Sequence, residues 1–127
     1  MYRYIAVRTD APGFSPDVGE RLSALGITLR ASLPGLVIYA SSETPVQIHS
    51  GNLVLIGHVF CRSTNAPITP DQLPASSLRD DIRHLIDQCW GEYMLLAPSD
   101  SPNELVAMRD PSGGLDCLYA PERGFLT

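Results

Sequence analysis

The residues most suggestive of chemistry form a glycine-containing run near the end of the chain. Residues 112–116 read Ser-Gly-Gly-Leu-Asp and match the SGGxD core of pyrophosphate-binding loops, where glycines let backbone N–H groups wrap a phosphate at the start of a helix. Residues 117–121 read Cys-Leu-Tyr-Ala-Pro, which is typical of a strand and a turn. We therefore predict a tight turn between two strands here, and no nucleotide site.

Cysteines and histidines are the other candidates for nucleophilic or metal chemistry. Cys61, Cys89 and Cys117 stand far apart, without a CxxC pair and without a histidine at ligand spacing. We interpret them as small buried hydrophobic residues and expect no metal site. Cys61 is the one alternative nucleophile, because it follows a strand with His58 nearby. An offset of three along a strand points these two side chains to opposite faces, which weighs against that role.

The charge pattern excludes several classes of function. The chain has 127 residues and a formal charge of −5, and its nine basic residues are all arginines. They are scattered singly, so we expect no nucleic-acid partner. The absence of lysine excludes Schiff-base chemistry and the lysine of a phosphate-binding loop. No apolar run approaches the roughly 20 residues that span a bilayer, and the opening residues do not resemble a signal peptide. We expect no membrane partner and a cytoplasmic location.

Apolar periodicity predicts the elements that must position these residues. Strands are expected at 2–7, 27–31, 36–40, 53–60, 92–97, 104–109 and 115–120, and helices at 16–25 and from Ser76 or Ser77 to Cys89. Strand 53–60 is apolar on both faces, so it should lie inside a covered sheet. The order of elements lacks a βαβ rhythm. The sequence therefore predicts one α+β domain over residues 1–127, with two mainly antiparallel sheets.

The second predicted helix carries an apolar stripe that we interpret as core. We expect Trp90 to pack at the end of this helix, with stacking on a ligand at the surface as the alternative. The stripe consists of Leu78, Ile82, Leu85, Ile86 and Cys89.

Three segments resemble the end of the class II glutamine amidotransferase domain of asparagine synthetases. Residues 89–96 contain a Gly-x-aromatic strand, residues 105–113 lead into Arg-Asp-Pro-Ser-Gly, and residues 117–119 read Cys-Leu-Tyr. The Trp-Gly-x-Tyr and Arg-Asp-Pro-Ser-Gly versions look most like the asparagine-synthetase-like cyclases that close the macrolactam ring of lasso peptides. Residues 55–60 lie where this branch has a comparable Gly-x-x-Phe strand. The resemblance implies an N-terminal-nucleophile-hydrolase-like (Ntn-hydrolase-like) sandwich of two sheets between flanking helices.

The resemblance also implies a partner, an ATP-dependent asparagine-synthetase-like domain that is either C-terminal to this one or separate. ATP and Mg²⁺ are expected only in that domain, and no cofactor is expected in this chain. In the lasso branch the partner would activate a carboxylate of a precursor peptide, and the peptide's own amine would close the amide. Such a reaction needs no ammonia, which gives a chemical reason for losing a glutaminase site.

The groups that a working glutaminase requires are missing from the matching positions. The family uses an N-terminal cysteine whose α-amino group acts as its base. Tyr2 takes that place, and a phenol with a pKa of about 10 is no substitute for a thiolate. The family's Asn-Gly oxyanion pair corresponds to Ile56 and Gly57, of which only Gly57 is expected to offer a donor, its backbone N–H. Both positions are therefore degenerate.

The family's grip on the substrate is also incomplete. Its arginine for the glutamine α-carboxylate has no match in residues 35–42, and the candidate for that arginine's acidic partner is Asp80 or Asp81.

Arg109, Asp110 and Gly113 are interpreted as a structural turn rather than a catalytic charge pair. Asp110 precedes Pro-Ser-Gly, so its carboxylate can accept backbone N–H bonds. Arg109 is expected to reach a carboxylate such as Asp116 or Glu92.

The sequence leaves three functions open, and with them the question of whether this chain is an enzyme. The leading hypothesis is a degenerate glutaminase-like domain that scaffolds or docks the synthetase domain. One alternative is an active glutamine amidohydrolase that uses Tyr2 or Cys61, and the other is a self-standing module that binds peptide at a sheet edge. The docking hypothesis predicts an apolar patch formed by Leu118, Phe125 and Leu126.

Overall fold

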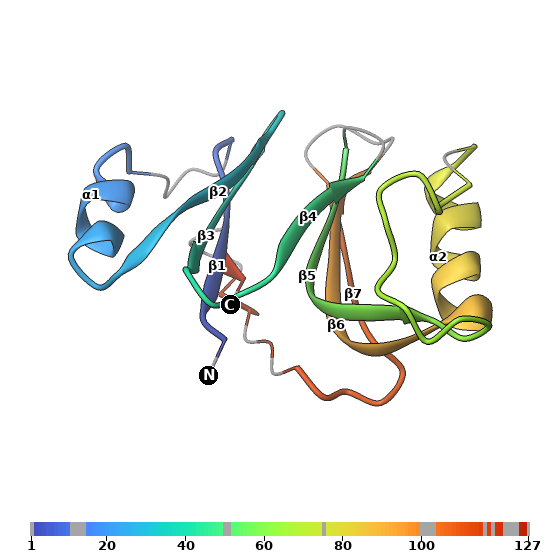
Figure 1. Cartoon of the computed structure of the whole chain (residues 1–127). Helices are drawn as coiled ribbons and strands as arrows, with labels where there is room; N and C mark the ends of the chain where they lie inside the picture. Colours follow the sequence, from blue (N-terminus) through green and yellow to red (C-terminus); the bar gives the residue numbers. More distant parts are fainter. Residues whose placement is uncertain are drawn as a thin grey trace.

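A computed structural model describes residues 2–10, 15–49, 52–74, 76–99, 104–115, 117, 119–120 and 125–126. These residues form strands and two helices, coloured along the chain in Figure 1. In chain order the elements are β1 (Tyr4–Arg8), α1 (Val18–Ser23), β2 (Ile27–Leu33), β3 (Leu36–Ser41), β4 (Val46–His49), β5 (Leu53–Cys61), α2 (Leu78–Gln88), β6 (Cys89–Pro98), β7 (Leu105–Arg109), β8 (Tyr119–Ala120) and β9 (Phe125–Leu126).

The strands form two antiparallel sheets. The first has the order β2-β3-β1, with the two-residue strands β9 and β8 following at the β1 edge. The second has the order β4-β5-β6-β7. The predicted α+β class with mainly antiparallel sheets is therefore confirmed.

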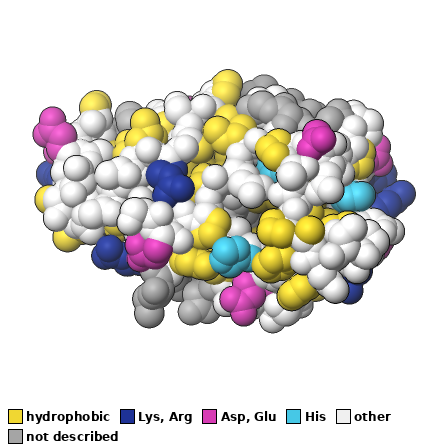
Figure 2. Space-filling view, viewed as in Figure 1, with side chains coloured by type: hydrophobic (Ala, Val, Ile, Leu, Met, Phe, Trp, Pro, Cys, Tyr) yellow, Lys and Arg dark blue, Asp and Glu magenta, His cyan; other side chains and the backbone are white. Residues whose placement is uncertain are grey.

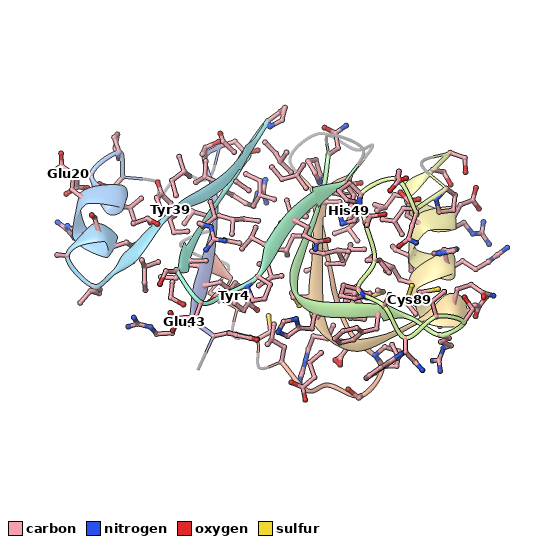
Figure 3. The ribbon with its side chains drawn as sticks, in the orientation of Figure 1. Tyr4, Glu20, Tyr39, Glu43, His49 and Cys89 are labelled. Atoms are coloured by element: carbon pink, nitrogen blue, oxygen red, sulfur yellow. The ribbon has the colours of Figure 1, made fainter. Side chains whose placement is uncertain are left out.

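The two sheets lie face to face between the two helices, with α1 beyond the first sheet and α2 beyond the second (Figure 1). One core fills the space between the sheets, and Tyr4 and Ile38 of the first sheet meet Ile56 of the second there. A second core lies between the second sheet and α2, where Leu85 of the helix belongs to the same cluster as Tyr93. On the outer face of the first sheet, Tyr39 lies against Gly19 of α1 (Figure 3).

Strands β5 and β6 separate the two cores, so they are buried on both faces. Successive side chains of a strand point to opposite faces. Val54 and Ile56 accordingly enter the core between the sheets, whereas Leu53 and Leu55 enter the core under α2. All four side chains are at most 3% exposed. The prediction that this strand lies inside a covered sheet is confirmed.

Several predicted boundaries are corrected. The first helix is short, and Gly26, with φ of 74°, follows it in a left-handed conformation. Of the strand expected at 115–120, the structure describes Tyr119–Ala120 as a strand and Leu115 as lying outside one, and neither β4 nor β9 was predicted. Strand β6 begins at Cys89, directly after α2, rather than at Glu92.

Helix α2 follows its predicted pattern with one exception. Ser77 caps it, because its hydroxyl accepts the N–H of Asp80 at 3.1 Å. Leu85 is fully buried, but Ile86 is 43% exposed, so its assignment to the core stripe was wrong. Ile86 is the next residue after Leu85, so it is rotated by about 100° away from the face that packs on the sheet.

Two glycines allow β5 and β6 to approach very closely. Gly57 and Gly91 have φ of 104° and 144°. A Cβ atom at Gly57 would lie 2.2 Å from the carbonyl oxygen of Glu92, and one at Gly91 would lie 2.0 Å from that of His58. Any side chain at either position would therefore force the strands apart. Near these glycines both strands bend as they leave the sandwich (Figure 1).

Tyr93, in the second core, gives a prediction about stability. Its side chain is fully buried, and its hydroxyl has no hydrogen-bond partner within the described ranges. We expect Tyr93→Phe to raise the free energy of unfolding by roughly 1 kcal/mol at neutral pH, because an unsatisfied buried hydroxyl is removed. Urea unfolding of both proteins measures the difference, and destabilisation by more than about 1 kcal/mol would contradict it.

The same substitution should change the dependence of stability on pH. Burial raises the pKa of Tyr93 from 10.0 to about 12. The unfolded chain therefore loses this proton first, and the wild type should lose stability as the pH rises from about 10 through 12. The Phe variant should lack this part of the decline.

Candidate functional site

A pocket of about 440 Å³ opens where β5 and β6 bend out of the sandwich. The floor of the pocket is formed by the face of β5 that carries Ile56. His58 and Phe60 lie two and four residues after Ile56, so their side chains point to the same face. The register places Glu92 opposite His58 and Trp90 opposite Phe60. The lining residues are His58, Phe60, Trp90, Gly91, Glu92 and Ser112.

A row of rings runs from the start of the chain across this floor. The Tyr2 ring centroid is 5.5 Å from that of His58, and the phenol hydroxyl is hydrogen-bonded to His58 Nε2. His58 stacks on Phe60 with centroids 6.0 Å apart, and Phe60 stacks on Trp90 at 4.7 Å. These spacings lie within the range of favourable ring contacts. Tyr2 precedes β1 of the first sheet, so the row joins the two sheets at this end.

Trp90 does not pack on α2 as predicted. Cys89 takes the buried position that faces the helix and is 2% exposed, so the next residue of the strand points to the other face. Trp90 is 43% exposed and lies on Phe60. In Figure 2, hydrophobic side chains gather next to a histidine and an acidic group on the lower part of the visible face, in the region of β5 and β6.

One wall of the pocket is the turn that follows β7. Asp110 is 3% exposed, and its carboxylate accepts the N–H of Gly114 at 3.1 and 3.2 Å and the Ser112 hydroxyl at 2.6 Å. These bonds close a turn over residues 110–114, which agrees with the interpretation of Asp110 as an acceptor of backbone N–H bonds. Arg109 does not reach a carboxylate within the described residues. Its guanidinium donates to the carbonyl of Gly113 at 2.6 Å, and Asp116 lies outside these residues.

This turn uses the backbone donors that a phosphate would need. The N–H of Gly113 donates to the Asp110 carbonyl at 3.0 Å, and the N–H of Gly114 is held by the Asp110 carboxylate. A phosphate would also face that carboxylate. The geometry supports the interpretation of residues 112–115 as a turn rather than a pyrophosphate loop.

Glu92 stands at the pocket, and no counter-charge is paired with it in the part of the chain that the structure describes. Its side chain lies against Gly114, where a Cβ atom would be 2.6 Å from Glu92 Cγ and 2.9 Å from Oε1. Arg8 pairs with Asp10 and Arg21 with Asp17, and no described arginine forms an ion pair with Glu92. The turn thus positions a carboxylate that is free to meet a cation.

Neither residue at the oxyanion position offers a donor. Ile56 is fully buried between the sheets. The N–H of Gly57 donates to the carbonyl of Pro45 at 2.9 Å, so the expectation that it remains available was wrong. The reason is β4, which the sequence did not predict and which pairs with β5 along this edge.

Cys61 lies on the other face of the sheet, away from the pocket. It packs against the core under α2 and stands directly opposite Cys89 in the register. The hydroxyl of Ser63, 3.1 Å from Cys61 Sγ, is the main cause that lowers its pKa from 9.0 to about 7. Asp80 and Asp81 belong to α2 and are also on this side, so neither can serve a substrate in the pocket.

The structure also bears on the expected absence of a metal site and of a membrane span, and on the apolar patch expected at Leu118, Phe125 and Leu126. The described residues contain no group of three or more His, Cys, Asp or Glu side chains that could hold a metal ion. Within the same residues, neither helix is long and apolar enough to cross a bilayer. Leu118 and the side chains of Phe125 and Leu126 lie outside what the structure describes.

No protein-family model, curated protein or solved structure matches this chain. The resemblance to asparagine-synthetase glutaminase domains therefore depends on the motifs quoted above.

Cys61 should be the reactive thiol of the β5–β6 pair. Its thiolate forms as the pH rises through about 7, whereas burial raises the pKa of Cys89. We expect iodoacetamide to label Cys61 with a midpoint near pH 7 and to leave Cys89 unlabelled in the folded protein. Peptide-resolved mass spectrometry across pH measures both rates. The matched variant Ser63→Ala should move the Cys61 midpoint upward, and an unmoved midpoint would contradict the assigned cause.

The Asp110 turn should contribute measurably to stability. Asp110→Ala removes the acceptor of the Gly114 N–H and of the Ser112 hydroxyl, so we expect a loss of roughly 2 kcal/mol in the free energy of unfolding. Ser112→Ala loses only one of these bonds and should cost less. Chemical denaturation of the two variants measures the difference, and equal losses would show that the turn does not depend on the carboxylate.

Proposed function

We propose that this chain is a degenerate glutaminase-like domain that docks or scaffolds an ATP-dependent, amide-forming synthetase domain. The observation that carries the proposal is the place of Tyr2. Its hydroxyl is hydrogen-bonded to His58 at the end of the sandwich where the two sheets meet the pocket. The position that holds the nucleophile in the resembled family is thus occupied by a phenol with a partner of its own.

The arrangement of layers supports the proposed ancestry. Helix, sheet, sheet and helix follow one another across the molecule (Figure 1), as in the Ntn-hydrolase-like sandwich that the sequence motifs imply. Tyr2 lies just before β1, and its hydroxyl reaches His58 of the second sheet, so this residue stands at the edge of the space between the sheets.

An active amidohydrolase is less well supported. A phenol beside an imidazole can exchange a proton, but acyl transfer also needs donors for the oxyanion. Gly57 has committed its N–H to Pro45, and Ile56 has no polar side chain. The Cys61 thiol is more acidic than that of Cys89. It lies on the face of the second sheet that is turned toward α2, whereas His58 and Tyr2 lie on the pocket side. The candidate groups for catalysis are therefore divided between the two faces of one sheet.

The proposed partner gives the domain a role that needs no hydrolysis. A synthetase of the lasso-peptide branch would bind ATP and Mg²⁺ itself, activate a carboxylate of its precursor peptide, and use the peptide amine as nucleophile. Ammonia would not be required, and the present domain would contribute a surface.

Two measurements test this proposal together. The purified chain should release no glutamate from glutamine, and Cys61→Ser should behave like the wild type. Addition of the asparagine-synthetase-like domain from the same genomic locus should slow hydrogen exchange in residues 104–126 of this chain. As a control, the solvent face of α1 should show no change. Glutamate release that Cys61→Ser abolishes would favour the amidohydrolase, and the absence of protection anywhere in the chain would overturn docking.

A further inference from the structure

The pocket on β5 and β6 carries both features that recognise a guanidinium group. Trp90 presents an indole that is 43% exposed, and the ring of Phe60 stacks on it at a centroid distance of 4.7 Å. An aromatic face attracts cations through its quadrupole, and the planar guanidinium of arginine stacks on it particularly well. The Phe60 stack limits the orientations of the indole, so less side-chain entropy is lost when a ligand binds.

A carboxylate lies beside this aromatic surface. Glu92 is two residues from Trp90 on the same strand, so the two side chains share a face. The turn at Gly114 limits where the Glu92 side chain can lie, and no described arginine neutralises it. A carboxylate accepts two parallel N–H bonds from one guanidinium. The Ser112 hydroxyl, whose proton goes to Asp110, keeps its oxygen as a further acceptor at the pocket.

Other ligand classes fit the lining less well. An anion would meet Glu92, and none of the described lining residues is an arginine or a lysine. A neutral aromatic group would cover Glu92 without pairing it, which carries a desolvation cost. A lysine ammonium would pair with Glu92 but is a compact, strongly hydrated charge that cannot stack in the plane of the indole. The formal charge of −5 on the chain also favours the approach of a cation.

We propose that this pocket binds an arginine side chain presented by a polypeptide, with the guanidinium stacked on Trp90 and paired with Glu92. The volume of about 440 Å³ leaves room for the methylene stem and for neighbouring backbone. This inference does not depend on the docking of a synthetase domain, because every group that it uses belongs to this chain.

Trp90 provides the assay, because it is the single tryptophan of the sequence. The probe is the peptide acetyl-Gly-Arg-Gly-amide, titrated into the full chain while tryptophan emission is recorded. We expect a saturable change in emission that weakens at high salt, since the pairing is partly electrostatic. The citrulline analogue has nearly the same shape without the charge and should give no saturable change. The lysine analogue should bind more weakly than the arginine peptide.

Variants separate the two parts of the pocket. Glu92→Gln should weaken binding by about fivefold or more, because it removes the charge that pairs with the guanidinium. Glu20→Gln removes the same charge from α1, far from the pocket, and should leave the affinity unchanged (Figure 3). Trp90→Leu removes the stacking surface and should abolish detectable binding by NMR titration. Both pocket side chains are exposed, so circular dichroism should show that each variant folds.

The outcomes decide the proposal directly. No saturable response to the arginine peptide would overturn it, as would equal binding of the citrulline analogue. An unchanged affinity in Glu92→Gln would remove the carboxylate from the proposed site. Because the experiment contains no synthetase domain, its failure leaves the docking proposal standing, and failure of docking leaves this one standing.

Discussion

The structure depends on the close pairing of β5 and β6 between two cores. Within the sandwich both strands are apolar on both faces, because one face packs against the first sheet and the other against α2. Gly57 and Gly91 permit the strands to approach within distances that no side chain could tolerate. Beyond these glycines the paired strands bend, and the residues that would have continued the core between the sheets become an open floor. The fold and the pocket thus have one physical origin.

The same pairing divides the reactive groups of the chain. Alternation along β5 sends His58 to the pocket and Cys61 to the side of α2, where Cys61 faces Cys89. A nucleophilic thiol and the imidazole nearest to it in sequence are therefore kept apart by the thickness of a sheet. Tyr2 reaches His58 because β1 starts at the same end of the molecule. What comes together is a set of rings and one carboxylate, which suits recognition better than covalent chemistry.

Sequence reasoning succeeded where a local signal was strong. The doubly apolar pattern of residues 53–60 indicated a buried strand, and the serines at 76 and 77 marked the start of α2, where the structure shows that Ser77 is the cap. It failed for β4, whose sequence Val-Gln-Ile-His has weak strand character and which forms through pairing with β5. Short strands of this kind depend on their neighbours more than on their own propensities. The β9 strand, two residues long, was missed for the same reason.

The candidate site was harder to predict than the fold, because its contacts join residues that are distant in sequence. The stacking of Phe60 on Trp90 follows from the β5–β6 register, which the sequence alone does not specify. The loss of the Gly57 N–H follows from the unpredicted β4.

The pocket combines a carboxylate and an exposed indole but lacks free oxyanion donors among the residues described, and a physical distinction between catalysis and recognition explains what this combination can do. Catalysis of acyl transfer requires several groups placed with sub-ångström accuracy around one reacting carbon. Recognition of a planar cation requires only a surface and a charge, whose energies depend less steeply on position. The bend at Gly57 and Gly91 exposes the aromatic surface and the carboxylate that recognition of a cation requires. Acyl transfer would need a nucleophile and oxyanion donors. The Tyr2 hydroxyl is bonded to His58, the Gly57 N–H is bonded to Pro45, and Ile56 has no polar side chain. The groups gathered at this end of the two sheets therefore meet the requirements for binding a cation, and they do not meet those for acyl transfer.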